Sequence, residues 1–209
     1  MSVVEDIKES VITGNVGKVR EYTENAVSDG LDVAEILNDG LIGGMTVVGV
    51  RFRDNEVYVP EVLVAALAMR TGMAVIKPLL ADSTVRERGV VVLGTVKGDL
   101  HDIGKNLVAM MLEGAGYRVI DLGIDAMPEK FVDGLAEYRP QIIGLSALLT
   151  TTMIKMKETV AELRTADASV KIMVGGAPVT QAFADDIGAD GYAADAGSAV
   201  DLANEILVS

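Results

Sequence analysis

The sequence predicts two parts: a four-helix bundle over residues 1–87, and a flavodoxin- or Rossmann-like α/β domain with a five-stranded parallel sheet over residues 88–209. Up to about residue 80, apolar residues recur every three or four positions, which is the helical period. After Ala81-Asp82-Ser83, short β-rich runs alternate with helix-length segments. Such alternation is typical of a parallel sheet with helices on both faces.

The helical part contains two clear apolar stripes. One helix is predicted to begin at Pro60, because proline suits a first helical turn, where its missing N–H costs nothing. Its stripe consists of Val62, Ala66, Met69, Met73, Ile76 and Leu80. An earlier stripe consists of Val33, Leu37, Leu41, Met45 and Val48. Gly14, Gly30 and residues 53–55 interrupt the pattern, so four helices are predicted, packed as a small antiparallel bundle.

The second part contains five predicted strands, which are continuously apolar, as strands buried on both faces should be. They are Val90–Val96, Arg118–Leu122, Ile142–Leu148, Ile172–Val174 and Tyr192–Ala194. Helices are predicted to begin near Ile103, Pro128, Thr151, Thr180 and Gly197.

Composition excludes several classes of function. The net charge of −13 works against binding nucleic acid or anionic lipid. The absence of Cys excludes disulfides, iron–sulfur clusters and thiolate zinc sites. The N-terminus lacks the basic start and apolar run of a signal peptide, and no stretch of roughly 20 apolar residues is free of charge. We therefore expect a cytoplasmic protein without a membrane span.

Three unusual segments follow predicted strands: Gly94–Gly104, Gly144–Thr152 and Val174–Pro178. In open α/β sheets, ligands bind beyond the carboxyl ends of the strands, near a switch in strand order. If the strand order is flavodoxin-like, the first, third and fourth strands are neighbours. The three segments then share one edge of the sheet, and this edge is the predicted site.

His101, the only histidine of the chain, lies in the first of these segments. Asp99, two residues earlier, is placed to accept a proton from one ring nitrogen, which fixes the tautomer and makes the other nitrogen a better metal ligand. One His cannot hold a free zinc or iron ion, because such sites need three or four ligands. A single imidazole suffices when the metal arrives inside a macrocycle, as in haem or a corrin.

Each feature also has an ordinary structural interpretation. A lone His in a loop is commonly a surface or hydrogen-bonding residue. Ser146 and Thr150–Thr152 suit the capping of the next helix, and Gly175-Gly176 suits a purely structural turn. The glycines of the first segment match neither GxGxxG nor the P-loop pattern, and no Gly-x-Ser-x-Gly elbow surrounds Ser146.

Together, the segments resemble a known family. Three motifs, in their order and spacing, are similar to a cobalamin-binding fingerprint. They are Asp99-x-His101-x-x-Gly104, then after 41 residues Ser146-x-Leu148, and after a further 26 residues Gly175-Gly176. Methionine synthase, methylmalonyl-CoA mutase and the corrinoid proteins of methyltransferase systems share this fingerprint. Residues 45–52 and 58–62 are similar to the helical cap of methionine synthase and of methanol- or methylamine-type corrinoid proteins. The whole chain thus resembles a stand-alone corrinoid protein.

This resemblance implies a binding mode for cobalamin or a related cobamide. The nucleotide tail enters the crevice at the sheet edge, and His101 replaces it as the lower axial ligand of cobalt. Asp99 is implied to bind His101, and Thr152 stands where methionine synthase has a serine. The implied cofactor-binding residues are Gly98, Asp99, His101, Asp102, Ile103, Gly104, Ser146, Leu148, Thr150, Gly175, Gly176 and Ala196, with Phe52, Val59 and Val62 of the cap over the upper face. On pattern alone, the three cap positions suit ordinary bundle core.

The implied activity is that of a methyl carrier, the corrinoid subunit of a multi-component methyltransferase that is not catalytic alone. Co(I) accepts a methyl group through a substrate-specific methyltransferase, and methyl-Co(III) donates it to a second methyltransferase with tetrahydrofolate or a thiol as acceptor. A reductive activation protein is a further implied partner. His101 is expected to dissociate when Co(I) forms, with its proton arriving through Asp99.

Two other functions remain open at this point. A B12-binding sensor or regulator usually adds a DNA-binding domain, and an adenosylcobalamin mutase subunit needs a partner barrel. The upper ligand, methyl or adenosyl, distinguishes them. The methyl donor stays open among methanol, methylamines, glycine betaine and methoxylated aromatics, because the partner methyltransferase selects it.

Overall fold

The computed structural model of the chain describes residues 2–80 and 87–208. These residues form two compact units, one built mainly from the chain up to Glu87 and the other mainly from Arg88 onward. The predicted joint at about residues 81–88 falls largely on residues 81–86, which lie outside the described residues. A helical first part and a five-stranded parallel sheet with helices confirm the predicted fold class.

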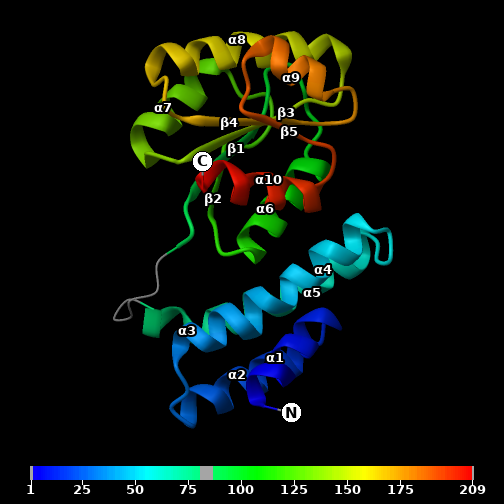
Figure 1. Cartoon of the computed structure of the whole chain (residues 1–209), viewed down its shortest axis with the longest axis vertical. Helices are drawn as coiled ribbons and strands as arrows, with labels where there is room; N and C mark the ends of the chain where they lie inside the picture. The colour runs from blue at the N-terminus through cyan, green and yellow to red at the C-terminus, as the bar shows by residue number, and fades with distance from the viewer. Residues whose placement is uncertain (1, 81–86, 209) are drawn as a thin grey trace. The chain divides into compact units, whose positions relative to one another are not determined.

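The first unit consists of helical segments (Figure 1). They are α1 (Val3–Ile12), α2 (Val16–Ser28), α3 (Val33–Glu35), η1 (Ile36–Ile42), α4 (Gly43–Arg53) and α5 (Val59–Leu80). Side chains fix several helix starts: Ser2, Asn15 and Asp32 each accept a backbone N–H from the first turn that follows. At the start of α5, the Glu61 carboxylate accepts the Tyr58 N–H at 3.0 Å.

The segments α3, η1 and α4 follow one another without a break and form one continuous rod, so residues 2–80 form a bundle of four helical rods. The middle of this rod is a π-helix, which has more than 3.6 residues per turn. The sequence pattern explains the wider turn, because Val33, Leu37, Leu41 and Met45 are each four residues apart. On a regular α-helix, side chains spaced four residues apart move gradually around the helix, because four residues exceed one turn of about 3.6. A helix with more residues per turn keeps them closer to one face. Leu37, Leu41 and Met45 are all buried.

Close packing holds the rods together. A Cβ at Gly72 of α5 would lie 2.5 Å from the Leu41 side chain, and one at Gly44 of α4 would lie 2.7 Å from Val11. These glycines therefore let the rods approach. Two described stretches, Val33–Arg53 and Val59–Leu80, are long and apolar enough to cross a membrane by length and composition alone. Their most apolar windows are 44% and 39% buried within the structure, and core helices of soluble proteins meet the same criterion.

The second unit is an α/β sandwich. Its elements are β1 (Val90–Thr95), α6 (Ile103–Gly114), β2 (Arg118–Asp121), α7 (Pro128–Tyr138), β3 (Ile142–Ser146), α8 (Thr150–Ala166), β4 (Lys171–Gly175), α9 (Gln181–Ile187), β5 (Gly191–Ala193) and α10 (Ala196–Val208). The strand order is β2-β1-β3-β4-β5 and every pair is parallel, which is the flavodoxin-like order. Helices α7, α8 and α9 cover one face, and α6 and α10 cover the other (Figure 1).

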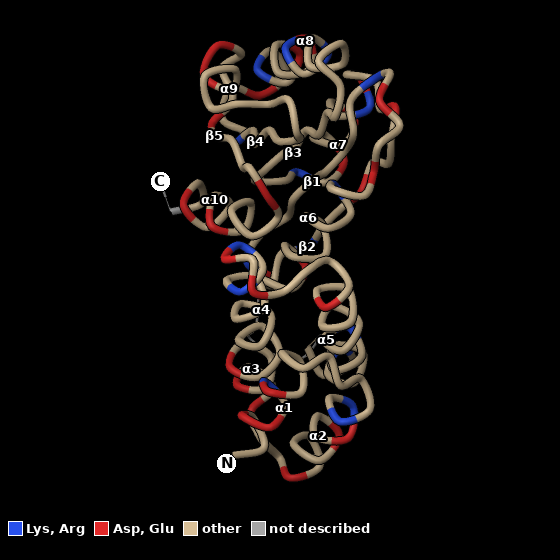
Figure 2. The backbone as a smooth tube through the Cα atoms, turned by 90° about the vertical axis from the view of Figure 1, so that its right-hand side faces the viewer, with Lys and Arg blue, Asp and Glu red and all other residues tan. Residues whose placement is uncertain are grey.

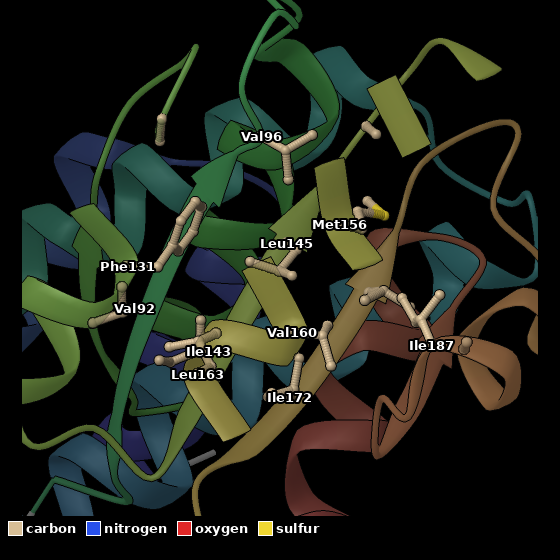
Figure 3. Close-up of a cluster of buried hydrophobic side chains, with 14 of the residues drawn as sticks. Val92, Val96, Phe131, Ile143, Leu145, Met156, Val160, Leu163, Ile172 and Ile187 are labelled. Atoms are coloured by element: carbon tan, nitrogen blue, oxygen red, sulfur yellow. The ribbon is translucent and has the colours of Figure 1, made fainter. Parts of the chain in front are cut away.

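One hydrophobic core of this unit lies between the sheet and α7–α9 (Figure 3), and buried residues of α6 and α10, such as Leu112 and Ala203, lie on the other face. Phe131 of α7 is fully buried against β1, where Gly94 leaves room, because a Cβ there would lie 2.6 Å from the ring. Gly94 thus belongs to the strand rather than to the turn that follows. Charged residues lie mainly on the helices and loops (Figure 2), and β1 and β3 contain none.

The first and third strands end earlier than predicted, whereas β4 ends one residue later, at Gly175. The first and third were expected to reach Val96 and Leu148, whereas β1 ends at Thr95 and β3 ends at Ser146. At the end of β3, the backbone N–H groups of Leu148 and Leu149 bind the Asp99 carboxylate instead of a neighbouring strand. The sheet therefore stops where the predicted site begins.

Candidate functional site

The ends of β1, β3 and β4 form the edge that carries the site. Thr95 pairs with Ser146, and Ser146 pairs with Gly175, so the last residues of three strands lie side by side. The segments that follow these strands are thus brought together, as the predicted strand order requires.

The His101 loop leaves β1 through a tight turn. The Asp99 N–H donates to the Val96 carbonyl at 3.1 Å, which closes a turn over Val96–Asp99. Gly98 has φ +81° at the third position of this turn, where a type II turn requires a left-handed residue. Farther along, the Thr95 hydroxyl donates to the His101 carbonyl at 2.9 Å. Both ends of the loop are therefore fixed to β1.

Asp99 is the most heavily bonded side chain of the site, and it is fully buried. Its Oδ1 accepts the His101 backbone N–H at 3.1 Å and lies 2.7 Å from His101 Nδ1. Its Oδ2 accepts the N–H groups of Leu148 at 2.7 Å and Leu149 at 3.3 Å, and the Thr152 hydroxyl at 2.7 Å. The carboxylate thus links β1, β3 and α8.

These bonds keep Asp99 ionised. Burial by itself raises the pKa of a carboxyl group, but the hydrogen bonds from Thr152, Leu148 and His101 outweigh it and hold the pKa of Asp99 well below its usual range. An ionised carboxylate only accepts hydrogen bonds, so His101 Nδ1 carries the proton of that bond. In the neutral ring, the lone pair is then on Nε2, which is the nitrogen available to a metal.

Thr152 does not cap its own helix. The N-cap of α8 is Leu149, which has no capping side chain, and the Thr152 hydroxyl faces Asp99 and the Leu149 carbonyl. A carboxylate from another loop instead lies at this helix end, where the helix dipole favours negative charge. The capping interpretation of Thr152 is therefore wrong, and a longer-range contact replaces it.

The surroundings of His101 suit a large flat ligand. Its side chain is 51% exposed, although it is bound to a carboxylate that is fully buried. Four large apolar residues in the adjoining segments are also exposed: Leu100 at 68%, Ile103 at 78%, Leu148 at 42% and Leu149 at 43%. No atom lies within 4 Å of a Cβ built on Gly104. This open apolar surface around one imidazole fits a macrocycle better than a small hydrated ion.

Asp102 directly precedes helix α6, which begins at Ile103. The Asn106 amide donates to the Asp102 carboxylate at 3.1 Å, and Asn106 in turn accepts from Lys105 at 2.7 Å. Lys105 also binds Asp121, at the end of β2, at 2.5 Å. A polar chain thus ties the residue after His101 to the sheet.

The remaining residues of the predicted pocket lie at the same edge. Ser146 ends β3, Thr150 begins α8 and is exposed, Gly175 ends β4, and Ala196 begins α10 and is buried. Gly176 has φ +120°, and a Cβ there would lie 1.9 Å from the Ala147 carbonyl oxygen. Glycine is therefore required at this position by the protein's own backbone, whatever else binds there.

The three predicted cap residues belong to the helical unit. Phe52 of α4 is half-buried, Val59 at the start of α5 is 36% exposed, and Val62 is fully buried. Val62 is thus part of the bundle core.

Sequence reasoning missed Thr95, Leu149 and Asp125. Leu149 contributes a backbone N–H, which leaves no signal in the sequence. Thr95 was visible as a polar residue near the end of a predicted buried strand, and Asp125 as an acid between the second strand and its helix. In residues 2–80 and 87–208, no three His, Asp or Glu side chains gather as a metal site.

Comparisons with known proteins agree with this geometry. A family model described as a B12 binding domain matches residues 89–201, and a second with that description matches residues 3–77. A corrinoid protein of Desulfitobacterium hafniense is 45% identical over 212 residues, covering 99% of this chain and 98% of its own. The chain belongs to the corrinoid proteins of methyltransferase systems.

Other relatives of this corrinoid protein carry the name of a methylamine or come from a solved methyltransferase complex. Trimethylamine corrinoid protein 1 of Methanosarcina acetivorans is 41% identical, covering 99% of this chain and 97% of its own. Among solved structures, a chain of the methanol:cobalamin methyltransferase complex of Methanosarcina barkeri superposes with a TM-score of 0.89 at 30% identity, covering 99% of this chain and 80% of that one. The predicted family resemblance is confirmed.

Proposed function

We propose that this corrinoid protein is a methyl carrier that holds a cobalamin or related cobamide, with His101 as lower axial ligand. One observation carries the proposal: a half-exposed imidazole whose Nδ1 is held at 2.7 Å by a buried, ionised carboxylate. A corrin would supply four nitrogens to cobalt, and His101 Nε2 would be the protein nitrogen available to bind it. Asp99 then fixes the ring orientation, as outer carboxylates do for other metal-bound histidines.

When bound, a corrinoid would supply a reduced cobalt that is a strong nucleophile toward activated methyl groups and a good donor of the methyl it has taken up. The chain's own residues hold and orient it. Asp99 and Thr152 keep the imidazole in one tautomer, and the exposed apolar residues around His101 would exclude water once a corrinoid covers them.

We assign the remaining pocket residues by their position at the sheet edge. Ser146, Leu148, Thr150, Gly175, Gly176 and Ala196 would line the crevice for the nucleotide tail, and Gly98, Asp102, Ile103 and Gly104 would border the corrin with the His101 loop. Residues 1–87 are proposed as the cap and residues 88–209 as the binding domain. Phe52 and Val59 are the better candidates for the upper face, since Val62 is buried in the bundle.

The partners follow from the relatives. Two of them are named for trimethylamine and dimethylamine, and another belongs to a methanol:cobalamin methyltransferase complex. We therefore propose a substrate-specific methyltransferase that loads the carrier, and a second methyltransferase that unloads it onto tetrahydrofolate or a thiol. A reductive activation protein and a cytoplasmic location complete the proposal.

The test is His101→Ala, since the chain has no second histidine to replace it. In the variant loaded with cob(II)alamin, we expect the corrinoid to stay bound while the nitrogen splitting of the cobalt EPR signal disappears. Free imidazole should restore the splitting. An unchanged signal in the variant would refute His101 as the ligand.

A second measurement separates the carrier from other corrinoid functions. Protein isolated from its native cells under anaerobic conditions and in the dark is expected to carry methyl or no upper ligand, and to pass the methyl group to an acceptor methyltransferase. An adenosyl upper ligand would instead favour a mutase subunit or a sensor.

A further inference from the structure

Asp125, in the loop between β2 and α7, contacts the His101 loop at two points. Its Oδ1 accepts the Gly98 N–H at 2.7 Å, and its backbone N–H donates to the Asp99 carbonyl at 3.0 Å. Asp125 thus binds two consecutive residues of the turn, Gly98 and Asp99. The side chain of Asp99 is the one that orients His101.

The backbone of both partners is adapted to this contact. Asp125 has φ +49°, in the left-handed region that Asp and Asn enter more readily than other non-glycine residues. Gly98 is the third residue of the turn over Val96–Asp99, whose own hydrogen bond uses the Asp99 N–H. The Gly98 N–H therefore needs an acceptor from outside the turn, and Asp125 provides it with a charged oxygen.

The loop that carries Asp125 is itself fixed to β1. The Thr95 N–H donates to the Gly123 carbonyl at 2.9 Å, and the Ala126 N–H donates to the Thr95 carbonyl at 2.9 Å. Val96 and Ala126 form a short parallel bridge. Asp125 is therefore a firm attachment point rather than a mobile loop residue.

We propose that Asp125 is a positioning residue of the cobalt-ligand site: it holds the turn that places Asp99, and through Asp99 it sets the orientation of the His101 imidazole. The inference rests on the proposed role of His101 as axial ligand. When the carboxylate is removed, the turn loses a charge-assisted bond, the imidazole samples more orientations, and the balance shifts from His-bound to His-free cobalt.

The test variant is Asp125→Gly. Glycine keeps the positive φ and the backbone bond to Asp99 but removes the acceptor of the Gly98 N–H. In protein loaded with cob(II)alamin, we expect an approximately tenfold shift toward cobalt without nitrogen splitting, the size that follows from losing one bond to a charged group. Asp125→Asn retains an acceptor and should restore most of the His-bound form.

Asp167 offers a matched control. Its carboxylate accepts the Ser169 N–H at 2.8 Å in the loop between α8 and β4, at the opposite edge of the sheet. Asp167→Gly should leave the nitrogen splitting unchanged. The proposal fails if Asp125→Gly keeps the wild-type ratio, if Asp125→Asn is no better than glycine, or if Asp167→Gly shifts the ratio equally.

Two readouts without corrinoid separate this inference from the proposed function. Histidine labelled with an NMR-active nitrogen isotope reports His101 alone, and Asp125→Gly should change the tautomer balance of its ring while His101→Ala remains the test of ligation. In the wild-type protein, the Gly98 amide should exchange at least about tenfold more slowly than in an unfolded chain. Exchange of that amide at the unfolded rate would overturn the proposal even if the variants do not fold.

Discussion

At the scale of single residues, Asp99 determines the site because it satisfies five donors with two oxygens. The donors come from two segments that are far apart in the sequence, His101 and residues 148–152, so the carboxylate both orients His101 and joins the two segments. Removing a buried acceptor leaves several buried donors without a partner, which costs more than the bonds themselves contribute. Asp99 is therefore structural and functional at once.

The low pKa of Asp99 predicts how stability of the corrinoid-free protein depends on pH. The carboxyl group binds a proton less readily in the folded chain than in the unfolded chain, where its pKa is about 3.9. Its contribution is therefore complete above that pH and decreases as the pH falls toward the lower folded pKa. We expect Asp99→Asn to reduce the free energy of unfolding by about 3 kcal/mol at neutral pH.

Urea unfolding between pH 7 and pH 3 measures this difference. The gap between wild type and Asp99→Asn should stay constant down to about pH 5 and become smaller below about pH 4. A gap that widens in acid would mean that Asp99 is not held ionised in the folded protein.

At this scale, the sequence predicted side chains but not their backbone partners. Asp99, His101 and Thr152 follow from the family fingerprint, and the structure brings all three into contact. The N–H groups of Leu148 and Leu149 could not be predicted, because every residue but proline has one. The role of Asp125 depends on the loop after β2 lying beside the turn over Val96–Asp99. The residue pattern of either segment alone does not indicate that the two are neighbours.

At the scale of elements, the site depends on where β3 ends and α8 begins. The strand was predicted to reach Leu148 because the run stays apolar, yet it ends at Ser146. Apolar character continues past the strand because Leu148 and Leu149 border the His101 loop as exposed residues. A run of apolar residues is thus interpreted as a buried strand. The same run can also end in an exposed apolar surface that a ligand would cover, and the pattern does not distinguish the two.

Helix α8 offers a test of the link between its N-terminal end and Asp99. Thr152→Val keeps the shape of the side chain and removes the hydroxyl bonded to the ionised carboxylate at 2.7 Å. We expect a loss of about 2 kcal/mol in the free energy of unfolding, because bonds to charged groups contribute more than neutral ones. Thr159→Val on the same helix is the control, since the buried Thr159 hydroxyl donates to the Lys155 carbonyl of its own helix.

Denaturant unfolding of both variants distinguishes the outcomes. Thr159→Val should cost less than about 1 kcal/mol, and Thr152→Ser should recover most of the loss. Equal effects at positions 152 and 159 would show that the bond to Asp99 adds nothing beyond an ordinary buried hydroxyl.

At the scale of the whole molecule, two cores account for the fold. The helical period up to residue 80 and the strand–helix alternation from residue 90 specify them separately, so the fold class followed from the sequence alone. The π-helix over Ile36–Ile42 did not, because a spacing of four was interpreted as part of a regular helix. Local periodicity predicts whether a segment is a helix or a strand more reliably than it predicts the number of residues per helical turn or the residue at which the element ends.

Separate cores predict that damage to the bundle leaves the ligand site intact. Ile7 of α1 is fully buried, and its side chain lies beside Gly40, where a Cβ would be 3.1 Å away. Ile7→Ala should cost about 2–5 kcal/mol, through lost burial and the cavity it leaves.

Hydrogen exchange of the α1 and α2 amides should report this loss. The labelled ring of His101, in the other unit, should keep its wild-type signal, since Asp99, Thr95 and Asp125 fix its loop within the α/β unit. A changed ring signal in Ile7→Ala would show that the bundle contributes to positioning the cobalt ligand.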